Sequence, residues 1–433
     1  MATKLVVVQV AALGWDLVKE LPGFHKAEAF FPAVTCTAQA GFRTASIPHD
    51  HGMVANGVRL PDLRKISFWE QSSALVQGER IWSRYRAAGR KVGMMFWQQS
   101  LGDSDLDLVL SPAPIHKHSG GMIQDCYAKP EGLSRWLDAK VGRPFNLMHY
   151  WGPLASGKSS AWITDATCAV MGHEQSAPDL LLSYLPHLDY DLQRHGPGSS
   201  QARASLDFTL SCIDRIRTAA QAQGYHWLFY GDYAIQPVSG AVFPNRRLLE
   251  AGLIETREIK QMLYADLFAS PAFAMVDHQV AHVFTRNARA TAAARDALTG
   301  LPGVDSILDR NQQAAIGIDH ARSGDLLLIA QSGKWFAYPW WTNKKQAPDF
   351  ATHVDIHNKP GYDPCELYFG WPPPSVSMDT NRIRGSHGRP GDSVAWTTSL
   401  EFPAHPETML ALARFTKVWL DSKASTGTIR VGI

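Results

Sequence analysis

The chain has 433 residues, of which 45% are hydrophobic and 19% are charged, and its formal net charge is +2. This composition supports a large buried core and excludes an intrinsically disordered protein. The sequence contains no block of basic residues, so we expect no nucleic-acid polymer as a partner.

The first apolar run, in MATKLVVVQVAALGW, is short and has a single basic residue before it. It lacks the length and the cleavage site of a secretory signal. No other run approaches the roughly 20 apolar residues that a membrane span needs. The five cysteines are scattered and form no CxxC pair, which disfavours a disulfide framework. We therefore expect no membrane association and a cytoplasmic location.

Strands and helices are predicted to alternate along the chain. Residues 4–10 form an apolar run typical of a buried strand, and residues 75–88 have helical spacing before the strand candidate 92–97. A long amphipathic helix over 203–222 precedes a strand at 227–230. This order predicts an α/β fold: a doubly wound, mostly parallel sheet with helices on both faces. In such sheets, ligands bind beyond the carboxyl ends of the strands.

We expect a single domain over residues 1–433 with less regular parts inside it. Residues 98–160 are rich in Gly, Pro, Ser and His, and we interpret them as an insertion. Residues 262–350 are predicted to form a small α+β subdomain. Its expected elements are one strand (PAFAMVDHQVAHVFTR), one helix (NARATAAARDALTGLPGV) and a hairpin of two strands (DLLLIA and KWFAY).

The first segment with chemical content is PAVTCTAQAGFRTASIPHDHGMVANG, residues 32–57. Thr35 follows an extended stretch and precedes a predicted helix, which places its hydroxyl near backbone N–H donors. Such a hydroxyl suits attack on an anionic phosphoryl group. The alternative is that Thr35 is simply the N-cap of that helix.

This segment resembles the nucleotide pyrophosphatase/phosphodiesterase branch of the alkaline phosphatase superfamily. Counting from Thr35, the positions that match the motif of that branch are Thr44, Pro48, His51, Gly52 and Asn56. Ala45 stands where the branch has a glycine. The resemblance implies the alkaline phosphatase-like fold, Thr35 as the nucleophile and Asn56 as a donor to a phosphoryl oxygen. An Asn-Gly turn is the alternative role for Asn56.

The resemblance also implies a pair of divalent metal ions held by three Asp and three His. In SYLPHLDYDLQRHGP the ligand Asp falls on Asp189, but Gln193 occupies the position of the His four residues later. The segment RGSHG places His387 in the final ligand motif of the branch. The resemblance assigns Asp189 and His387 to one metal position.

The other metal position is more altered. In YGDYAIQPV, Asp232 retains the ligand Asp, and Tyr233 replaces the His that follows it. At the end of the first strand, Ala11 or Ala12 stands where the branch has an Asp. The expected cofactor is a divalent metal, zinc with manganese or iron as alternatives, and whether one or two ions bind is left open.

Two further segments could supply replacement ligands. His278 and His282 lie four residues apart in an expected strand and would share a face. His353, Asp355 and His357 alternate in THVDIHNKPGYDP, so their side chains would converge on one face of a strand. The alternative is that these histidines form hydrogen bonds within loops.

The residues support two interpretations of function. The first is a metal-dependent hydrolase of a phosphate ester, phosphodiester or phosphonate, in which Thr35 attacks phosphorus and a small anionic molecule is the substrate. The second is a catalytically altered or inactive pseudoenzyme that binds an anionic metabolite or a partner protein. Tyr233 could serve as a general acid or a phosphoryl ligand in a rebuilt site.

Overall fold

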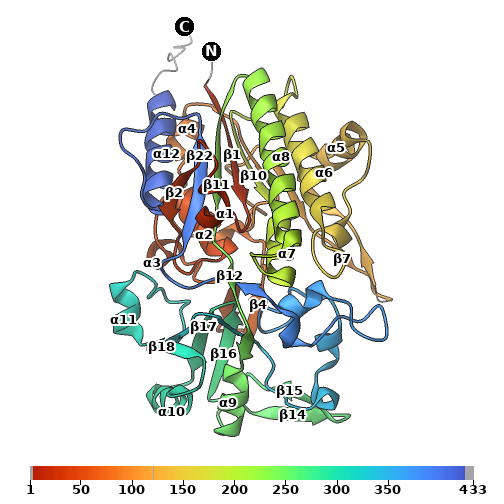
Figure 1. The fold of residues 1–433 in the computed structure, drawn as a ribbon, viewed down its shortest axis with the longest axis vertical. Helices are drawn as coiled ribbons and strands as arrows, with labels where there is room; N and C mark the ends of the chain where they lie inside the picture. The colour runs from red at the N-terminus through yellow and green to blue at the C-terminus, as the bar shows by residue number, and fades with distance from the viewer. Residues whose placement is uncertain (1–2, 120, 425–433) are drawn as a thin grey trace.

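The computed structural model describes residues 3–119 and 121–424. An eight-stranded sheet forms the centre of the upper part of the molecule in Figure 1. Its strands are β1 (Lys4–Val10), β2 (His25–Glu28), β5 (Val92–Met95), β6 (Leu108–Pro112), β9 (Cys126–Lys129), β10 (Leu180–Leu185), β11 (Tyr225–Gly231) and β22 (Ser393–Thr398). They lie in the order β2-β22-β11-β1-β10-β5-β6-β9. The five strands from β11 to β6 are parallel, and β22 and β9 flank them antiparallel.

The predicted doubly wound α/β sheet is therefore confirmed. Alternate residues of β1 point to opposite faces: Val6 and Val8 pack into one hydrophobic core, and Leu5 and Val7 into another. One core is covered by α5 (Leu133–Val141), α6 (Gly157–Met171), α7 (His187–His195) and α8 (Ser200–Ala222). The other is covered by α2 (Thr35–Thr44), α4 (Ser83–Ala87) and α12 (Met409–Ala424). The short helices α1 (Trp15–Val18) and α3 (Pro48–His51) lie in the connections.

A second, four-stranded antiparallel sheet forms the lower part of the molecule in Figure 1. It has the order β16-β17-β19-β18, with the strands β16 (Ala272–Asp277), β17 (Val280–Thr285), β18 (Val304–Leu308) and β19 (Leu326–Ala330). Three helices accompany it: α9 (Pro244–Glu250), α10 (Ala288–Leu298) and α11 (Arg310–Ala315). These strands, with α9 and α10, enclose a separate hydrophobic core.

Short paired strands and 3-10 helices complete the described chain. The pairs are β3 (Gly57–Leu60) with β4 (Lys65–Phe68), β7 (Ile115–His116) with β8 (Met122–Ile123), β12 (Gln236–Pro237) with β21 (Gly385–Ser386), β13 (Gly240–Val242) with β20 (Lys334–Phe336), and β14 (Thr256–Ile259) with β15 (Met262–Ala265). The 3-10 helices are Ser73–Leu75, Leu147–His149, Lys344–Gln346, Asp349–Thr352, Pro364–Leu367 and Thr380–Arg382.

Several predicted elements are confirmed, and one helix is largely wrong. The strands expected at 4–10 and 227–230 are β1 and β11, and the helix expected over 203–222 is α8. The helix expected over 75–88 is reduced to α4, because the chain turns at Gly78 with a φ of +90°. A backbone with that φ leaves the right-handed helical region, and glycine adopts it without steric strain.

Two strand predictions in the lower part are also wrong. The segment PAFAMVDHQVAHVFTR forms two strands, β16 and β17, which reverse at His278 with a φ of +59°. DLLLIA and KWFAY do not pair with each other as a hairpin. The first lies as β19 between β17 and β18, and the second begins as β20 alongside β13.

The segment 98–160 contributes to the central sheet as well as to the surface. Its strands β6 and β9 extend the sheet at one edge, while β7 and β8 form a separate hairpin. Among the described residues, no helix combines the length and apolarity that crossing a membrane would require.

Candidate active site

Three adjacent parallel strands end at one edge of the central sheet, and the candidate residues gather there. Ala12 follows β1, Asp232 follows β11, and Asp189 lies in the first turn of α7, directly after β10. Helix α2 begins at the same edge with Thr35 as its first residue. This is the position at which doubly wound sheets bind ligands.

Thr35 is not the N-cap of its helix. Val34, in an extended conformation, occupies that position and offers no side-chain cap. Thr35 is 3% exposed, and its side chain lies close enough to the phenol groups of Tyr184 and Tyr233 to lower the pKa of each, against the larger rise caused by burial. The Thr35 hydroxyl therefore lies at the positive end of a ten-residue helix, between two phenol groups.

Asn56 holds the start of the same helix. Its Oδ1 accepts a hydrogen bond of 2.9 Å from the backbone N–H of Cys36. Its Nδ2 and backbone N donate to the two carboxylate oxygens of Asp277, at 3.1 and 2.7 Å. One amide hydrogen of Asn56 is thus used in the bond to Asp277. The other amide hydrogen could donate to a phosphoryl oxygen, which is the role predicted for Asn56.

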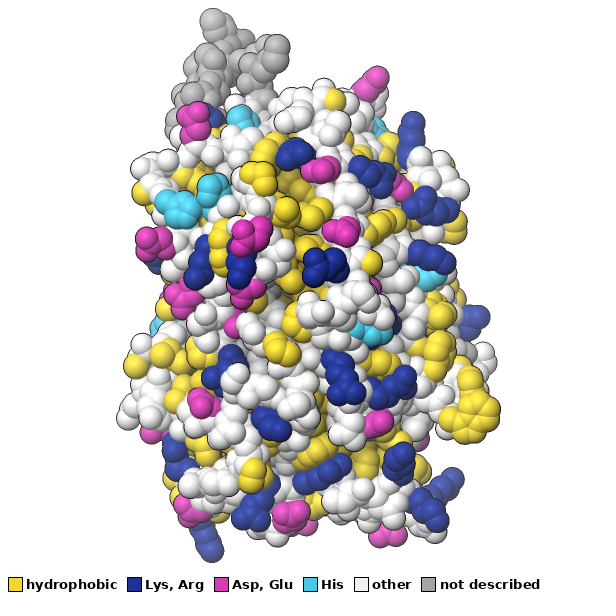
Figure 2. Space-filling model, viewed as in Figure 1, with side chains coloured by type: hydrophobic (Ala, Val, Ile, Leu, Met, Phe, Trp, Pro, Cys, Tyr) yellow, Lys and Arg dark blue, Asp and Glu magenta, His cyan; other side chains and the backbone are white. Residues whose placement is uncertain are grey.

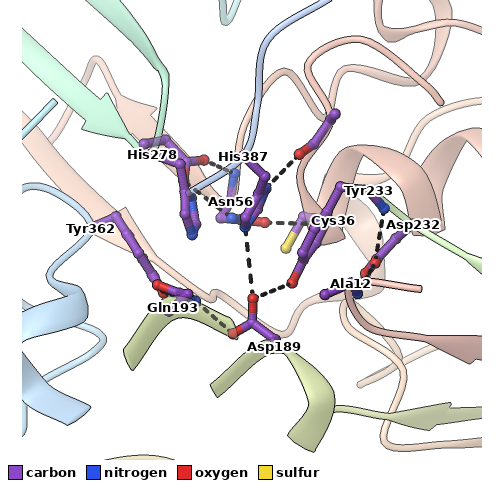
Figure 3. Close-up of polar contacts among 12 residues, drawn as sticks. Ala12, Cys36, Asn56, Asp189, Gln193, Asp232, Tyr233, His278, Tyr362 and His387 are labelled. Atoms are coloured by element: carbon purple, nitrogen blue, oxygen red, sulfur yellow. Dashed lines mark hydrogen bonds and ion pairs between the residues drawn. The ribbon is translucent and has the colours of Figure 1, made fainter. Parts of the chain in front are cut away.

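Asp189 is held by the two residues that replace histidines. Gln193 Nε2 donates to its Oδ2 at 2.5 Å, and the Tyr233 hydroxyl donates to its Oδ1 at 3.0 Å (Figure 3). Burial raises the pKa of Asp189 to about 7, and the two hydrogen bonds oppose that rise. Both oxygens of this carboxylate therefore already have a protein partner.

Asp232 is similarly enclosed. Gln9 Nε2 donates to its Oδ2 at 2.8 Å, and the backbone N–H groups of Ala12 and Tyr233 each donate to its Oδ1 at 3.0 Å. Burial raises the pKa of Asp232 to about 8. Gln9 lies on β1, and its hydrogen bond brings a neutral donor to the carboxylate where a metal ion would otherwise bind.

His387 offers one free ring nitrogen. Its Nδ1 lies 2.6 Å from the Ala33 carbonyl oxygen, so Nδ1 carries the proton and Nε2 has the lone pair. Nε2 is buried without a hydrogen-bond partner and lies 4.0 Å from Asp189 Oδ1. The ring stacks on Tyr233 with centroids 3.4 Å apart, and burial holds the pKa of His387 well below its ordinary value.

These residues do not fit the predicted metal centre. Zinc takes three or four N, S or O ligands from a protein. Within residues 3–119 and 121–424, no group of three His, Cys, Asp or Glu side chains converges closely enough to hold an ion. Asp189 and His387 approach each other, but Gln193 has taken the place of a third ligand. Asp232 belongs to a separate cluster with Gln9.

The proposed replacement ligands do not repair this deficit. His278 lies in the turn after β16, where Nδ1 is 2.7 Å from Asp277 Oδ1 and the ring stacks on Tyr362. His282 lies on β17 and is committed elsewhere: its Nε2 is 3.1 Å from the Val54 carbonyl oxygen. The expectation that His278 and His282 share one strand face is wrong, because the chain reverses between β16 and β17.

The alternation of His353, Asp355 and His357 on a strand is also wrong. The segment is a loop that follows the 3-10 helix Asp349–Thr352. Asp355 and His357 line the pocket described below, and His353 is absent from its lining. His357 Nδ1 lies 3.2 Å from the Phe68 carbonyl oxygen, which supports the alternative of a loop hydrogen bond.

A pocket of about 220 Å³ opens above this polar cluster. Thr35, Asp189, Tyr233 and His278 line its inner end. Its remaining walls are mostly apolar and aromatic, and include Trp69, Leu147, Met148, Tyr150, Trp151 and Ile356. The predicted residues Thr35, Asp189, Tyr233, His278, Asp355 and His357 thus meet at one cavity.

The sequence interpretation missed three residues that shape the site. Gln9 binds Asp232, Tyr184 contacts Thr35, and the Tyr362 hydroxyl lies 2.9 and 3.0 Å from the two amide atoms of Gln193. Gln9 could have been found, because a glutamine inside the apolar strand KLVVVQV is an unexpected buried polar group that needs a partner. Nothing local in the sequence connects Tyr362 to a helix about 170 residues earlier.

Comparisons with known proteins give a family match. The model of the family "Type I phosphodiesterase / nucleotide pyrophosphatase" matches residues 16–363. A search of curated proteins found no match.

Several solved structures share the fold. Phosphonoacetate hydrolase from Sinorhizobium meliloti 1021, in complex with phosphonoformate, is 14% identical, with 98% of this chain and 96% of that chain covered and a TM-score of 0.63. Murine ectonucleotide pyrophosphatase/phosphodiesterase 5 is 14% identical over 97% and 95% of the two chains, with a TM-score of 0.58. The human protein of that name is 15% identical over the same shares, with a TM-score of 0.55.

The family match spans most of the chain, and its residues include Thr35, Asn56, Asp189 and Asp232. The likeness to the solved structures shows a shared fold over nearly the whole length of both chains. The chain therefore belongs to the Type I phosphodiesterase / nucleotide pyrophosphatase family of hydrolases, in the alkaline phosphatase superfamily.

Proposed function

We propose that this protein hydrolyses a small anionic phosphate ester, phosphodiester or phosphonate, with Thr35 as the nucleophile. The observation that carries the proposal is the placement of Thr35 at the inner end of the pocket and at the N-terminus of α2. A helix N-terminus favours an anionic group through its N–H donors and its dipole. Membership of a hydrolase family supports the same chemistry.

The proton of Thr35 has a path away from the nucleophilic oxygen. The Thr35 side chain lies next to the Tyr233 phenol and lowers its pKa, and the Tyr233 hydroxyl donates to Asp189 Oδ1 at 3.0 Å. As Thr35 attacks phosphorus, its proton can pass to the Tyr233 oxygen while the Tyr233 proton passes to Asp189. Asp189 then acts as the base through Tyr233.

We assign no metal-assisted step. The expected zinc, manganese or iron ion would have to displace the hydrogen bonds that Gln193 and Tyr233 make to Asp189. The free Nε2 of His387 could serve such an ion as a nitrogen ligand. The proposed mechanism therefore relies on the side chains and on the helix N-terminus.

One observation favours the second candidate, a protein that binds its ligand without turnover. All four carboxylate oxygens of Asp189 and Asp232 already accept hydrogen bonds from Gln9, Gln193, Ala12 and Tyr233. A network satisfied in this way is stable without a ligand or an ion. Such a protein would use the pocket to bind an anionic metabolite or to engage a partner protein.

Comparing the wild type with Thr35→Ala distinguishes the two candidates. The measurement is kcat/KM for bis(p-nitrophenyl) phosphate after treatment with a chelator. The proposed nucleophile predicts a loss of at least about 1,000-fold in Thr35→Ala and partial activity in Thr35→Ser. Equal rates in the wild type and Thr35→Ala would overturn the hydrolase. Retained substrate binding in both, measured by equilibrium dialysis, would then favour the binding protein.

The cytoplasm is the compartment that we propose for this activity. All five cysteines lie in the described chain, and all are free. Free thiols in such number are typical of a reducing environment.

A further inference from the structure

We infer that a cluster of basic residues in the lower part of the molecule is a binding site for a phosphate or sulfate dianion. The cluster consists of Arg59, Arg64, Lys65 and Arg286, which line a cavity of about 30 Å³. This cavity shares no lining residue with the pocket beside Thr35. The inference is therefore independent of the proposed hydrolase activity.

The cavity lies where the hairpin of β3 and β4 meets the second sheet. Arg59 is on β3, Arg64 is in the turn, Lys65 begins β4, and Arg286 directly follows β17. Lys and Arg side chains predominate over acidic ones on the lower part of the face shown in Figure 2. The charge of this part of the molecule thus also favours an anion.

Four positive charges face the cavity, and no acidic residue lines it. The rest of the lining is apolar apart from Ser270 and Thr285. Within residues 3–119 and 121–424, none of the four cations has a carboxylate within ion-pair distance. Like charges gathered in this way repel one another, and a bound dianion would offset the repulsion.

Two of the guanidinium groups are already held in place. Arg59 Cζ lies 5.0 Å from the centroid of the Phe284 ring, which is 7% exposed. Arg286 Nη2 donates to the carbonyl oxygens of Phe268 and Ala269, at 2.7 and 2.6 Å. Side chains that are ordered beforehand lose less conformational entropy when they bind an anion.

The nearby carboxylate of Asp325 balances the cluster only in part. Burial lowers the pKa of Arg59, Asp325 opposes this change, and Arg64 lowers the pKa further. Asp325 Oδ2 already accepts hydrogen bonds from the backbone N and Oγ1 of Thr285, at 2.7 and 2.8 Å. A dianion in the cavity would supply the counter-charge that Arg59 and Arg64 lack.

The size of the cavity and its donors favour a tetrahedral oxyanion. A cavity that holds one water molecule needs about 10–15 Å³, so this cavity suits a group such as phosphate or sulfate. Guanidinium groups can bind two oxygens of such an anion at once, which a halide does not allow.

A phosphate dianion is available both in solution and on anionic lipids, and two exposed apolar side chains flank the cavity. Leu63 precedes Arg64 and is 63% exposed, and Phe268 follows the lining residue Leu267 and is 69% exposed. Apolar side chains beside a basic cluster are also found where proteins bind anionic membranes. The experiments below therefore separate the two sources.

Calorimetry with inorganic phosphate at pH 8 and constant ionic strength tests the site in the full chain. We expect Arg59→Gln with Arg64→Gln to bind phosphate at least about 10-fold more weakly than the wild type. The matched control is Arg257→Gln with Lys260→Gln, which removes the same charge at exposed positions that line neither cavity. It should bind phosphate like the wild type. Sulfate should compete, and chloride should not.

Sedimentation with vesicles identifies the source of the phosphate group. The vesicles are phosphatidylcholine with about 20% phosphatidic acid. If the site takes a lipid headgroup, the wild type sediments with them, inorganic phosphate releases it, and Phe268→Ser weakens the association. If the site takes free phosphate, the protein stays in solution although calorimetry shows binding.

Three outcomes would overturn the inference. They are no binding of phosphate by the wild type, equal affinities in the wild type and in Arg59→Gln with Arg64→Gln, and competition by chloride as strong as that by sulfate. Circular dichroism checks that the double variant folds. Should it not fold, Lys65→Gln replaces it, because Lys65 is exposed, and at least about threefold weaker binding is expected.

Discussion

Tyr233 connects the two carboxylates of the site. Its hydroxyl donates to Asp189, its backbone N–H donates to Asp232, and its ring lies flat against His387 with an interplanar angle of 1°. A histidine at this position could not make the same hydroxyl contact. Tyr233 therefore supplies a hydrogen-bond donor to the neighbouring carboxylate at the position where the branch has a nitrogen ligand, and Gln193 does the same.

The first prediction at the residue scale is that one substitution converts the polar cluster into a metal site. Gln193→His would place a third ligand beside Asp189 and His387, because Gln193 already reaches Asp189 Oδ2 at 2.5 Å across one turn of α7. We expect this variant to bind about one equivalent of zinc, measured by elemental mass spectrometry after dialysis.

The control is the double variant Gln193→His with Asp189→Asn, which should lose that zinc. Stoichiometric zinc in the wild-type protein, lost in Asp189→Asn alone, would show that the hydrogen-bonded arrangement gives way to an ion. That result would contradict our interpretation of the cluster.

The sequence identifies the positions of this site better than it predicts their contacts. The spacing from Thr35 to Asn56 and the motifs around Asp189 and Asp232 select residues that the structure brings to one edge of the central sheet. The sequence alone could not show that Gln9 pairs with Asp232 across more than 220 residues. Contacts of that kind depend on which strands become neighbours, and β11 lies next to β1 only in the folded sheet.

At the scale of elements, helix α2 carries the nucleophile and ends in a strained residue. Ala45 stands where the motif of the phosphodiesterase branch has a glycine. It is the C-cap of α2, with φ +50° and ψ +39°. A residue with a Cβ pays a steric penalty in this left-handed conformation, and glycine does not. Ala45 therefore holds a conformation that a glycine would adopt without this penalty.

Ala45→Gly should therefore stabilise the protein, against the usual effect of glycine in a helix. We expect the free energy of unfolding in urea to rise by about 0.5–1 kcal/mol. Ala292→Gly, at an exposed position inside α10, is the control and should lower it by about 1 kcal/mol. Destabilisation by both changes to a similar extent would show that Ala45 is not strained.

The turn between β16 and β17 shows why element prediction failed in the lower part. Residues 271–286 contain two mostly apolar runs separated by Asp277, His278 and Gln279, a break without glycine, proline or asparagine, so the pattern predicts one strand rather than two. The reversal occurs at His278, where Nδ1 binds Asp277 and the ring packs on Tyr362. Tertiary contacts therefore hold a turn that lacks the usual glycine or asparagine.

At the scale of the whole molecule, His282 ties the second sheet to the segment that bears the nucleophile motif. Its Nε2 donates to the Val54 carbonyl oxygen, and its Nδ1 accepts from the Gly324 N–H, both at 3.1 Å. Both ring nitrogens are therefore used by the neutral form. Burial lowers the pKa of His282 to about 4, because a charged ring would be poorly solvated there.

This arrangement predicts a loss of stability in mild acid. Between pH 6.5 and pH 4 the unfolded chain binds a proton at His282 and the folded chain does not, so stability falls as the pH falls through this range. At pH 5 the contribution of His282 to the loss should be about 2 kcal/mol.

Urea unfolding at pH 7.5 and pH 5.0 checks this prediction. His282→Gln retains a donor for Val54 but cannot take up a proton, so the difference in stability between the two pH values should shrink by about 2 kcal/mol. His118→Gln, at an exposed position, should behave like the wild type. An unchanged pH dependence in His282→Gln would contradict the assignment.

Trapping the covalent intermediate would show whether Thr35 attacks phosphorus. The protein is mixed with excess p-nitrophenyl methylphosphonate, and the reaction is quenched in acid. After digestion, the mass of the peptide that contains Thr35 is measured by mass spectrometry. We predict a methylphosphonyl group on Thr35 in the wild type, with a matching burst of p-nitrophenol, and neither signal in Thr35→Ala. Release of p-nitrophenol by Thr35→Ala at the wild-type rate, with no adduct on Thr35 in the wild type, would show that Thr35 is not the nucleophile.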